Sequence, residues 1–151
     1  MDQKRQFYTL KGYQLNETVS LTPAMEDYLE MIYRILCERK VVRIGELAKM
    51  LHVASSSASK MVRQLHELGL VAFEKYGYIQ MTEKGLAQGG YLLYRHEVLH
   101  TFLCLLNGSQ EELEQVEKIE HFLNRETIHN LELLTQEMKK KKTMAPEITA
   151  P

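Results

Sequence analysis

The sequence has no tryptophan, two cysteines and three prolines among 151 residues. It has no uninterrupted apolar run near the ~20 residues that a membrane-spanning helix needs, so we expect no membrane partner. No apolar core follows the charged N-terminus as it would in a secretory signal, so we expect a cytoplasmic protein. Cys37 and Cys104 stand in apolar, helix-like surroundings, which favour buried thiols over a disulfide or a thiolate metal site.

The length and composition describe an ordinary soluble globular chain. Hydrophobic residues make up 44% and charged residues 26%, which argues against wholesale disorder. The length has room for one compact domain, or for a small domain with an oligomerisation arm, and excludes a large multidomain enzyme.

The net charge of -1 conceals an uneven distribution along the chain. Residues 39–84 carry eight Lys and Arg against four Asp and Glu, a net +4, whereas residues 1–38 are net -2 and residues 85–151 are net -3. A basic segment between acidic flanks is where a DNA backbone would bind. The alternative is a solvated surface of Lys and Arg, which charge alone does not distinguish.

Apolar spacing predicts a mainly α-helical chain. Thr22 and Pro23 are suited to cap and begin a helix over residues 24–39, and further helices are expected over 44–53 and over 54–70, the latter stopped by Gly69. Two β-prone runs flank Tyr76-Gly77 and predict a hairpin. This order of elements is a winged helix-turn-helix.

The rest of the chain predicts a second, helical part. One long helix is expected from about Glu83 to Leu106, and a last helix from Ser109 or Gln110 to about Lys140. Five methionines, at positions 25, 31, 50, 61 and 81, are expected to pack in the core. The expected organisation is an arm (1–20) and a winged helix domain (21–84), followed by a helical metal-binding and dimerisation domain (85–142) and a disordered tail (143–151).

The helix over 54–70 would be the one that enters the major groove, because the N-terminal side chains of such a helix meet base edges and phosphates. It opens with small serines that permit close approach, although Ser55 could simply cap the helix. Surface placement is the alternative for the wing residues. The expected DNA-binding residues are Ser55, Ser56, Ser57, Ser59, Lys60, Arg63, Gln64, Lys75 and Tyr76.

Carboxylates and histidines recur at helical spacing in three distant segments. Asp27 and Glu30 share one helix face, and Glu117, Glu120 and His121 form an E-x-x-E-H pattern. Oxygen and imidazole donors without a thiolate suit Mn²⁺ or Fe²⁺. Taken singly, each pattern is more often a solvated surface, and spacing alone does not bring the segments together.

Several strings of the sequence resemble the diphtheria toxin repressor family over roughly residues 21–135. They are LTPAMEDYLEMIY, ELAKMLHVASSSASKMVRQLHELGLV, FEKYGYIQMTEKG, YRHEVL and VEKIEHFL. The resemblance implies a dimeric, metal-activated repressor that binds double-stranded operator DNA through winged helix domains. It implies six metal ligands per subunit, with Glu30 and Glu120 bridging two ions: Asp27, Glu30, His96, Glu117, Glu120 and His121.

Two positions point to the manganese-dependent branch of this family. By the resemblance, Asp27 stands where the iron-responsive branch carries Met, and Glu117 where that branch carries Cys. We therefore expect Mn²⁺ as co-repressor, with Fe²⁺, Co²⁺, Cd²⁺ or Zn²⁺ as substitutes. We also expect no SH3-like domain and no small organic substrate.

Three other functions compete with this prediction. A di-metal enzyme also holds carboxylates and histidines on facing helices, but the predicted winged helix and the absence of a substrate-binding motif favour a regulator without enzymatic activity. The same fold could respond to Fe²⁺ instead. It could also respond to an organic ligand, with the acidic residues merely solvated. Metal titration with DNA binding separates these cases.

Overall fold

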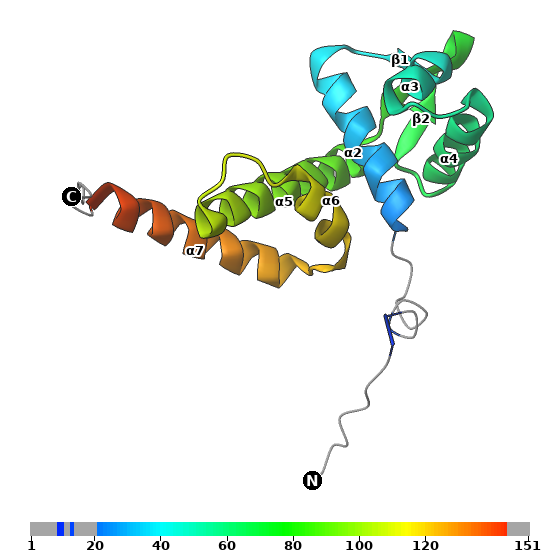
Figure 1. The fold of residues 1–151 in the computed structure, drawn as a ribbon. Coiled ribbons are helices and arrows are strands. Elements are labelled where there is room, and N and C mark those ends of the chain that lie inside the picture. Colours follow the sequence, from blue (N-terminus) through cyan, green and yellow to red (C-terminus); the bar gives the residue numbers. More distant parts are fainter. Residues whose placement is uncertain (1–8, 11–12, 14–20, 145–151) are drawn as a thin grey trace.

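The computed structural model of the protein describes residues 9–10, 13 and 21–144. Residues 145–151 and nearly all of the predicted N-terminal arm lie outside the described ranges. The described chain forms two parts joined by one long helix, as Figure 1 shows: a winged helix-turn-helix at one end and a helical extension at the other. Within these ranges no helix is both long and apolar enough to cross a membrane.

Helix α2 (Pro23–Glu38) begins as the sequence predicts. Pro23 occupies the first turn, and the Thr22 hydroxyl accepts a hydrogen bond from the Met25 backbone N–H at 3.2 Å, which satisfies one of the free donors at the helix start. One face of α2 is buried in the core through Leu29 and Ile32. Cys37, in the last turn of α2, is exposed, so the predicted burial of that thiol is wrong.

Helices α3 (Ile44–Leu51) and α4 (Ser55–Glu67) form the helix-turn-helix. His52 ends α3 in the left-handed conformation, with φ 57°. Gly69 takes φ +75° just after α4, as expected of a helix stop that glycine adopts without steric cost. Leu47, Val62 and Leu65 are fully buried in the shared core, whereas Met50 is 44% exposed, which contradicts its predicted core position.

The wing is a three-stranded antiparallel sheet in the order β1-β3-β2. The predicted hairpin is confirmed as β2 (Val71–Phe73) and β3 (Tyr78–Met81), joined by the short 3-10 turn η1 (Lys75–Gly77). A third strand, β1 (Val42–Arg43), was not predicted: Val42 pairs with Ile79. A strand of two residues is too short to show an alternating pattern, so the sequence predicted only a break between two helices at this point.

Helix α5 (Glu83–Asn107) runs from the wing into the helical extension. Its ends match the sequence: Thr82 caps it by accepting from the Gly85 N–H at 3.0 Å, and Gly108 ends it with φ +61°. At Gly89 an added Cβ would lie 2.8 Å from Tyr33, so the absence of a side chain lets α5 cross α2 closely.

The prediction of a single last helix is wrong, because the α-helix is interrupted between Ile119 and Arg125. The structure has α6 (Leu113–Ile119), the 3-10 turn η2 (Glu120–Phe122) and then α7 (Arg125–Met144). Leu123 is extended, and Asn124 Oδ1 accepts from the Thr127 N–H at 2.8 Å, which starts α7 anew. Helix α7 includes Thr143 and Met144, which were expected in the tail.

A second core fills the helical extension. Helices α5 and α7 pack against each other there, around Val98, Leu99, Leu103 and Ile128, and Val116 of α6 joins them. Cys104 is half-buried with its thiol 3.6 Å from His100 Nε2, and neither described cysteine forms a disulfide.

Candidate metal centre and DNA-binding face

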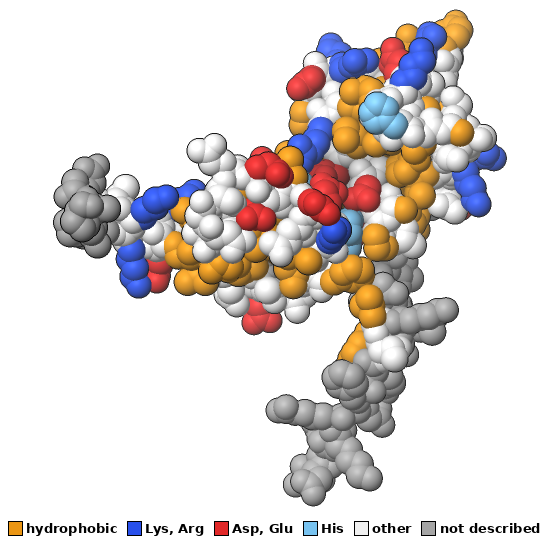
Figure 2. All heavy atoms as spheres, in the orientation of Figure 1, with side chains coloured by type: hydrophobic (Ala, Val, Ile, Leu, Met, Phe, Trp, Pro, Cys, Tyr) orange, Lys and Arg blue, Asp and Glu red, His pale blue; other side chains and the backbone are white. Residues whose placement is uncertain are grey.

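Acidic side chains and two histidines gather where the winged helix meets the helical extension. Figure 2 shows red side chains concentrated at this junction. Three separate segments supply them: α2, the middle of α5, and the end of α6 with η2. The structure thus brings together all six predicted ligand residues, in two clusters.

The first cluster consists of Glu30, His96, Glu117 and Glu120. His96 Nδ1 lies 3.0 Å from Glu120 Oε2, 3.6 Å from Glu117 Oε1 and 4.0 Å from Glu30 Oε1. One donor atom from each residue lies within 4.8 Å of the others. His96, Glu30 and Glu120 are buried, whereas Glu117 is exposed at the rim.

The second cluster consists of Asp27, Glu120 and His121. His121 Nε2 lies 3.2 Å from Asp27 Oδ1 and 3.9 Å from Glu120 Oε1. Glu120 therefore offers one oxygen to each cluster, which is the geometry of a bridging carboxylate. Glu30, which the resemblance also implied as a bridge, lies in the first cluster alone.

The crowding of carboxylates changes the acidity of the groups around them. Burial and, second, the charge of Glu120 raise the pKa of Glu30 to about 7. Partial burial and the same charge raise the pKa of Glu117. The hydrogen bond to Glu120 raises the pKa of His96, and hydrogen bonds to Asp27 and Glu26 raise that of His121 to about 10. Without metal, these carboxyl and imidazole groups therefore keep their protons to higher pH than the same groups do in water.

These residues fit a pair of divalent cations. Glu30 Oε1 is buried without a hydrogen-bond partner, since Arg34 Nη2 and His96 Nδ1 lie 3.7 Å and 4.0 Å away, and such a carboxylate would be stabilised by a cation in direct contact. The clusters contain four carboxylates and two imidazoles and no thiolate, a donor set suited to hard or borderline ions. Two divalent ions would balance four carboxylate charges.

Sequence reasoning missed two residues of this centre, Glu26 and Arg95. Arg95 is 4% exposed, and its Nη1 donates to Glu26 Oε2 at 3.0 Å. The other oxygen of Glu26 lies 3.1 Å from His121 Nδ1. Glu26 adjoins Asp27 in sequence but contacts different partners, and the one sequence signal for Arg95 was its place next to His96 in the string YRHE.

The raised pKa values predict how the stability of the metal-free protein depends on pH. Glu30 and His121 hold protons in the folded state that they lose in the unfolded state above their ordinary pKa values, 4.5 and 6.5. This stabilisation is complete at low pH and is lost as pH rises through about 7 and about 10. Stability should fall between pH 5.5 and 8, by on the order of 1 kcal/mol.

Thermal unfolding in chelator at the two pH values measures this difference. Glu30→Gln should reduce the fall in stability, because it removes one of the two groups that retain a proton, and the part due to His121 should remain. A melting temperature that rises from pH 5.5 to pH 8 would contradict the assignment.

The face predicted to bind DNA lies on α4. Ala54 is its N-cap, with no side-chain cap, so the alternative role of Ser55 as the cap is wrong. Ser55, Ser56 and Ser57 are exposed on the first turn, where the backbone N–H groups are free of a side-chain cap. Lys60 and Arg63 are exposed further along, and Ser59 and Gln64 are half-buried at the edge of the same face.

The wing tip projects away from the core. Tyr76 is 85% exposed and adopts φ 67°, a left-handed conformation that a non-glycine residue takes at a cost. The neighbouring Lys75 belongs to the same turn, and its side chain lies outside the described part of the structure. Among the described side chains, the exposed basic residues of this predicted face are thus Lys60 and Arg63 of α4.

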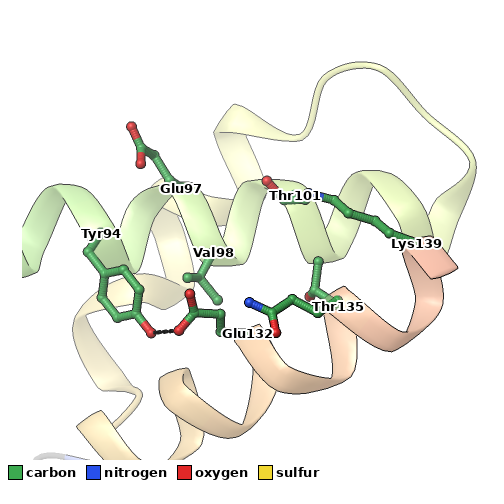
Figure 3. Close-up of a pocket in the computed structure, with 8 residues that line it drawn as sticks. Tyr94, Glu97, Val98, Thr101, Glu132, Thr135 and Lys139 are labelled. Carbon is green, nitrogen blue, oxygen red and sulfur yellow. Dashed lines mark hydrogen bonds between the residues drawn. The ribbon is translucent and has the colours of Figure 1, made fainter.

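A hollow of about 190 Å³ lies between α5 and α7, and none of the predicted ligand residues lines it. Figure 3 shows Tyr94 and Val98 of α5 facing Glu132 and Thr135 of α7 across it, with the Tyr94 hydroxyl donating to Glu132. Thr135 is buried with an unpartnered hydroxyl among the described residues.

Comparison with known proteins agrees with this architecture. The family pattern described as iron dependent repressor, N-terminal DNA binding domain, matches residues 20–79. The pattern described as iron dependent repressor, metal binding and dimerisation domain, matches residues 82–149. The chain belongs to the iron dependent repressor family. It is therefore a member of a family of DNA-binding regulators, built from a winged helix-turn-helix and a metal-binding, dimerising helical domain.

Individual relatives are similar over most of the chain. An HTH-type transcriptional regulator MntR of Geobacillus kaustophilus (strain HTA426) is 40% identical over 116 residues, 76% of this chain and 82% of the relative. One from Lysinibacillus sphaericus (strain C3-41) is 35% identical over 130 residues, 85% of this chain and 94% of the relative.

Among solved structures, the manganese regulator SloR matches with a TM-score of 0.66 and 28% identity over 77% of this chain. The match covers 55% of the SloR chain, so this chain spans about half the length of that protein.

Proposed function

We propose that this protein is a manganese-dependent transcription repressor that binds operator DNA as a homodimer and controls metal homeostasis. The observation that carries the proposal is the convergence of α2, α5 and the α6–η2 segment into two ligand clusters that share Glu120. Helix α2 belongs to the DNA-binding part, whereas α6 and η2 belong to the dimerising part. A metal centre at this position joins the two.

Manganese is the ion that the donor set and the relatives favour. One ion would be held by Glu30, His96, Glu117 and Glu120, and the other by Asp27, Glu120 and His121. Neither cysteine of the described chain enters a cluster, which argues against a preference for softer ions. The relatives named MntR and the manganese regulator SloR support the same choice. Fe²⁺, Co²⁺, Cd²⁺ and Zn²⁺ are substitutes in this proposal.

Charge repulsion within the clusters explains why metal favours DNA binding. Without metal, like charges 4 Å apart repel by about 1 kcal/mol in water and by more where solvent is excluded. The protons on Glu30 and His121 offset only part of this repulsion in the metal-free protein, so the contact of α2 with Glu117 and Glu120 is weak and the two winged helix domains of a dimer sample several spacings. Divalent ions held by these residues would supply the positive charge that keeps the carboxylates of α2 beside those of Glu117 and Glu120.

With its clusters closed, the dimer presents two α4 helices at a fixed separation. Two recognition helices enter successive major grooves only if they lie about 34 Å apart. Each tenfold gain in DNA affinity needs about 1.4 kcal/mol of coupling. In this proposal the contacts to DNA come from the serines of α4, from its polar side chains and from the wing: Ser55, Ser56, Ser57, Ser59, Lys60, Arg63, Gln64, Lys75 and Tyr76.

Fluorescence anisotropy of labelled duplex DNA fragments, selected from a random-sequence library with the protein and Mn²⁺, tests the proposal. With Mn²⁺ at constant ionic strength, the protein should bind one fragment at least about 10-fold more tightly than with chelator. Equal affinity in both conditions would refute metal control. A response to Fe²⁺ alone would assign the chain to an iron-responsive repressor.

A variant of the recognition helix separates DNA contact from metal binding. Arg63 is exposed on α4 and belongs to neither ligand cluster. Arg63→Ala should lower DNA affinity in Mn²⁺ while the uptake of Mn²⁺ stays that of the wild type. Lys118→Ala, which removes an exposed lysine paired with Glu114 on α6, is the matched control.

A further inference from the structure

The strongest arrangement outside the six ligand residues is a buried chain of charged groups that ends on a ligand histidine. Arg95 of α5 donates to Glu26 of α2 at 3.0 Å, and Glu26 faces His121 Nδ1 at 3.1 Å. The side chains of Arg95, Glu26 and His121 are 5%, 11% and 6% exposed. Water is thus largely excluded from both contacts.

The roles of donor and acceptor in this chain are fixed by chemistry. Arg95 Nη2 lies 3.5 Å from His121 Nδ1, but a guanidinium has only donors and cannot accept a proton from the ring. Glu26 is the acceptor for Nδ1–H, at the shorter distance. The other ring nitrogen, Nε2, is thereby turned toward Asp27 and Glu120, the partners of His121 in the second cluster.

Both oxygens of Glu26 are occupied, which excludes it from the clusters themselves. Oε2 is held by Arg95 and Oε1 faces His121, and neither oxygen belongs to the two groups of ligand atoms. The cation of Arg95 also requires neutralisation, because an unpaired buried guanidinium beside a cation site would repel the ion.

We propose that Glu26 and Arg95 are positioning residues for the second ion site, which hold His121 with Nδ1–H donated to Glu26 and with Nε2 directed at the ion, whose binding would release the Nε2 proton to solvent. This inference rests on the proposed function. Groups that orient a ligand imidazole in this way typically change metal affinity by about 10- to 100-fold when they are removed. Because the first cluster does not contain His121, the effect should be confined to one of two sites.

Titration with Mn²⁺, followed by the EPR signal of the free aqueous ion, tests the inference. The wild type should take up two ions per subunit. Glu26→Ala should bind one ion with affinity within about 3-fold of the wild type and the other at least about 10-fold more weakly. Glu97→Gln, an exposed carboxylate on α5 outside both clusters, should bind as the wild type does.

A second readout distinguishes positioning from a general structural role. In ¹⁵N-histidine-labelled protein loaded with diamagnetic Cd²⁺, the His121 Nδ1 should carry a proton that exchanges slowly with solvent. In Glu26→Ala that proton should exchange rapidly. Should Glu26→Ala fail to fold, Glu26→Gln takes its place: its amide oxygen still accepts from Nδ1–H but leaves Arg95 without a counter-charge, so it should show a smaller loss at the same site.

The failures are distinguishable. A wild-type protein that takes up no Mn²⁺ would refute the proposed function. A wild type that binds two ions, together with Glu26 variants that bind both equally well or lose both equally, would overturn the positioning role alone.

Discussion

We expect Glu120→Gln to eliminate the stimulation of DNA binding by Mn²⁺, an effect that for coupled sites is typically about 5- to 150-fold. Glu120 is 1% exposed and offers one oxygen to each cluster, so the substitution removes the negative charge that both clusters share and leaves a single amide oxygen in place of two carboxylate oxygens. The glutamine keeps the shape of the buried side chain, which avoids the cavity that alanine would leave. DNA affinity measured with Mn²⁺ and with chelator should then be nearly equal.

The same variant should leave the metal-free fold at least as stable. Glu120 lies beside Glu30, whose pKa its charge helps to raise, so loss of that charge relieves a repulsion even as it weakens the contact to His96. Glu114→Gln on α6, whose side chain is 83% exposed, is the control and should respond to Mn²⁺ normally. A full Mn²⁺ response in Glu120→Gln would remove the shared carboxylate from the mechanism.

We expect Gly85→Ala to destabilise the protein by about 3 kcal/mol. An added Cβ would lie 1.9 Å from the backbone oxygen of Leu70, far inside any allowed contact. That oxygen already accepts from the Thr82 N–H at 3.2 Å, so it cannot move without disturbing the start of α5. Chemical denaturation of the metal-free protein at matched concentration measures the loss.

Gly45→Ala is the contrasting substitution. Gly45 lies in α3 with nothing within 4 Å of its added Cβ, so alanine there should stabilise the helix, by up to about 1 kcal/mol. Equal effects of the two substitutions would show that helix propensity, and not the close approach of α5 to Leu70, governs these positions.

Local chemistry explains which parts of the fold could be predicted. Several helix ends were predictable because some residue types begin or end helices by their own conformational preferences. In the structure a helix begins at Thr22 with Pro23, and helices end at Gly69 and Gly108. The break at Leu123 was hidden because apolar residues continue at helical spacing on both sides of it. Asn124, a good N-cap three residues before Thr127, was the local feature that marked it.

The proposed ligand residues could be predicted from the sequence as single residues but not as two clusters. Only the resemblance joined Asp27, His96 and Glu120, because no spacing rule connects residues so distant along the chain. Glu26 and Arg95 were missed for a related reason: their role lies in a contact between α2 and α5 that helical periodicity does not encode. The sequence allowed two roles for Ser55, helix cap or DNA contact, because the preceding residue, Ala54, is a poor capping residue.

The continuity of α5 makes it a lever arm. Its 25 residues span about 38 Å, and His96 lies about 20 Å from the end that carries the wing. A tilt of about 10° at the level of His96 moves that end by about 3 Å, close to one base-pair step along the DNA axis. In the proposed dimer, two such helices would turn a small tilt at His96 into a change in the position of each α4 helix along the DNA.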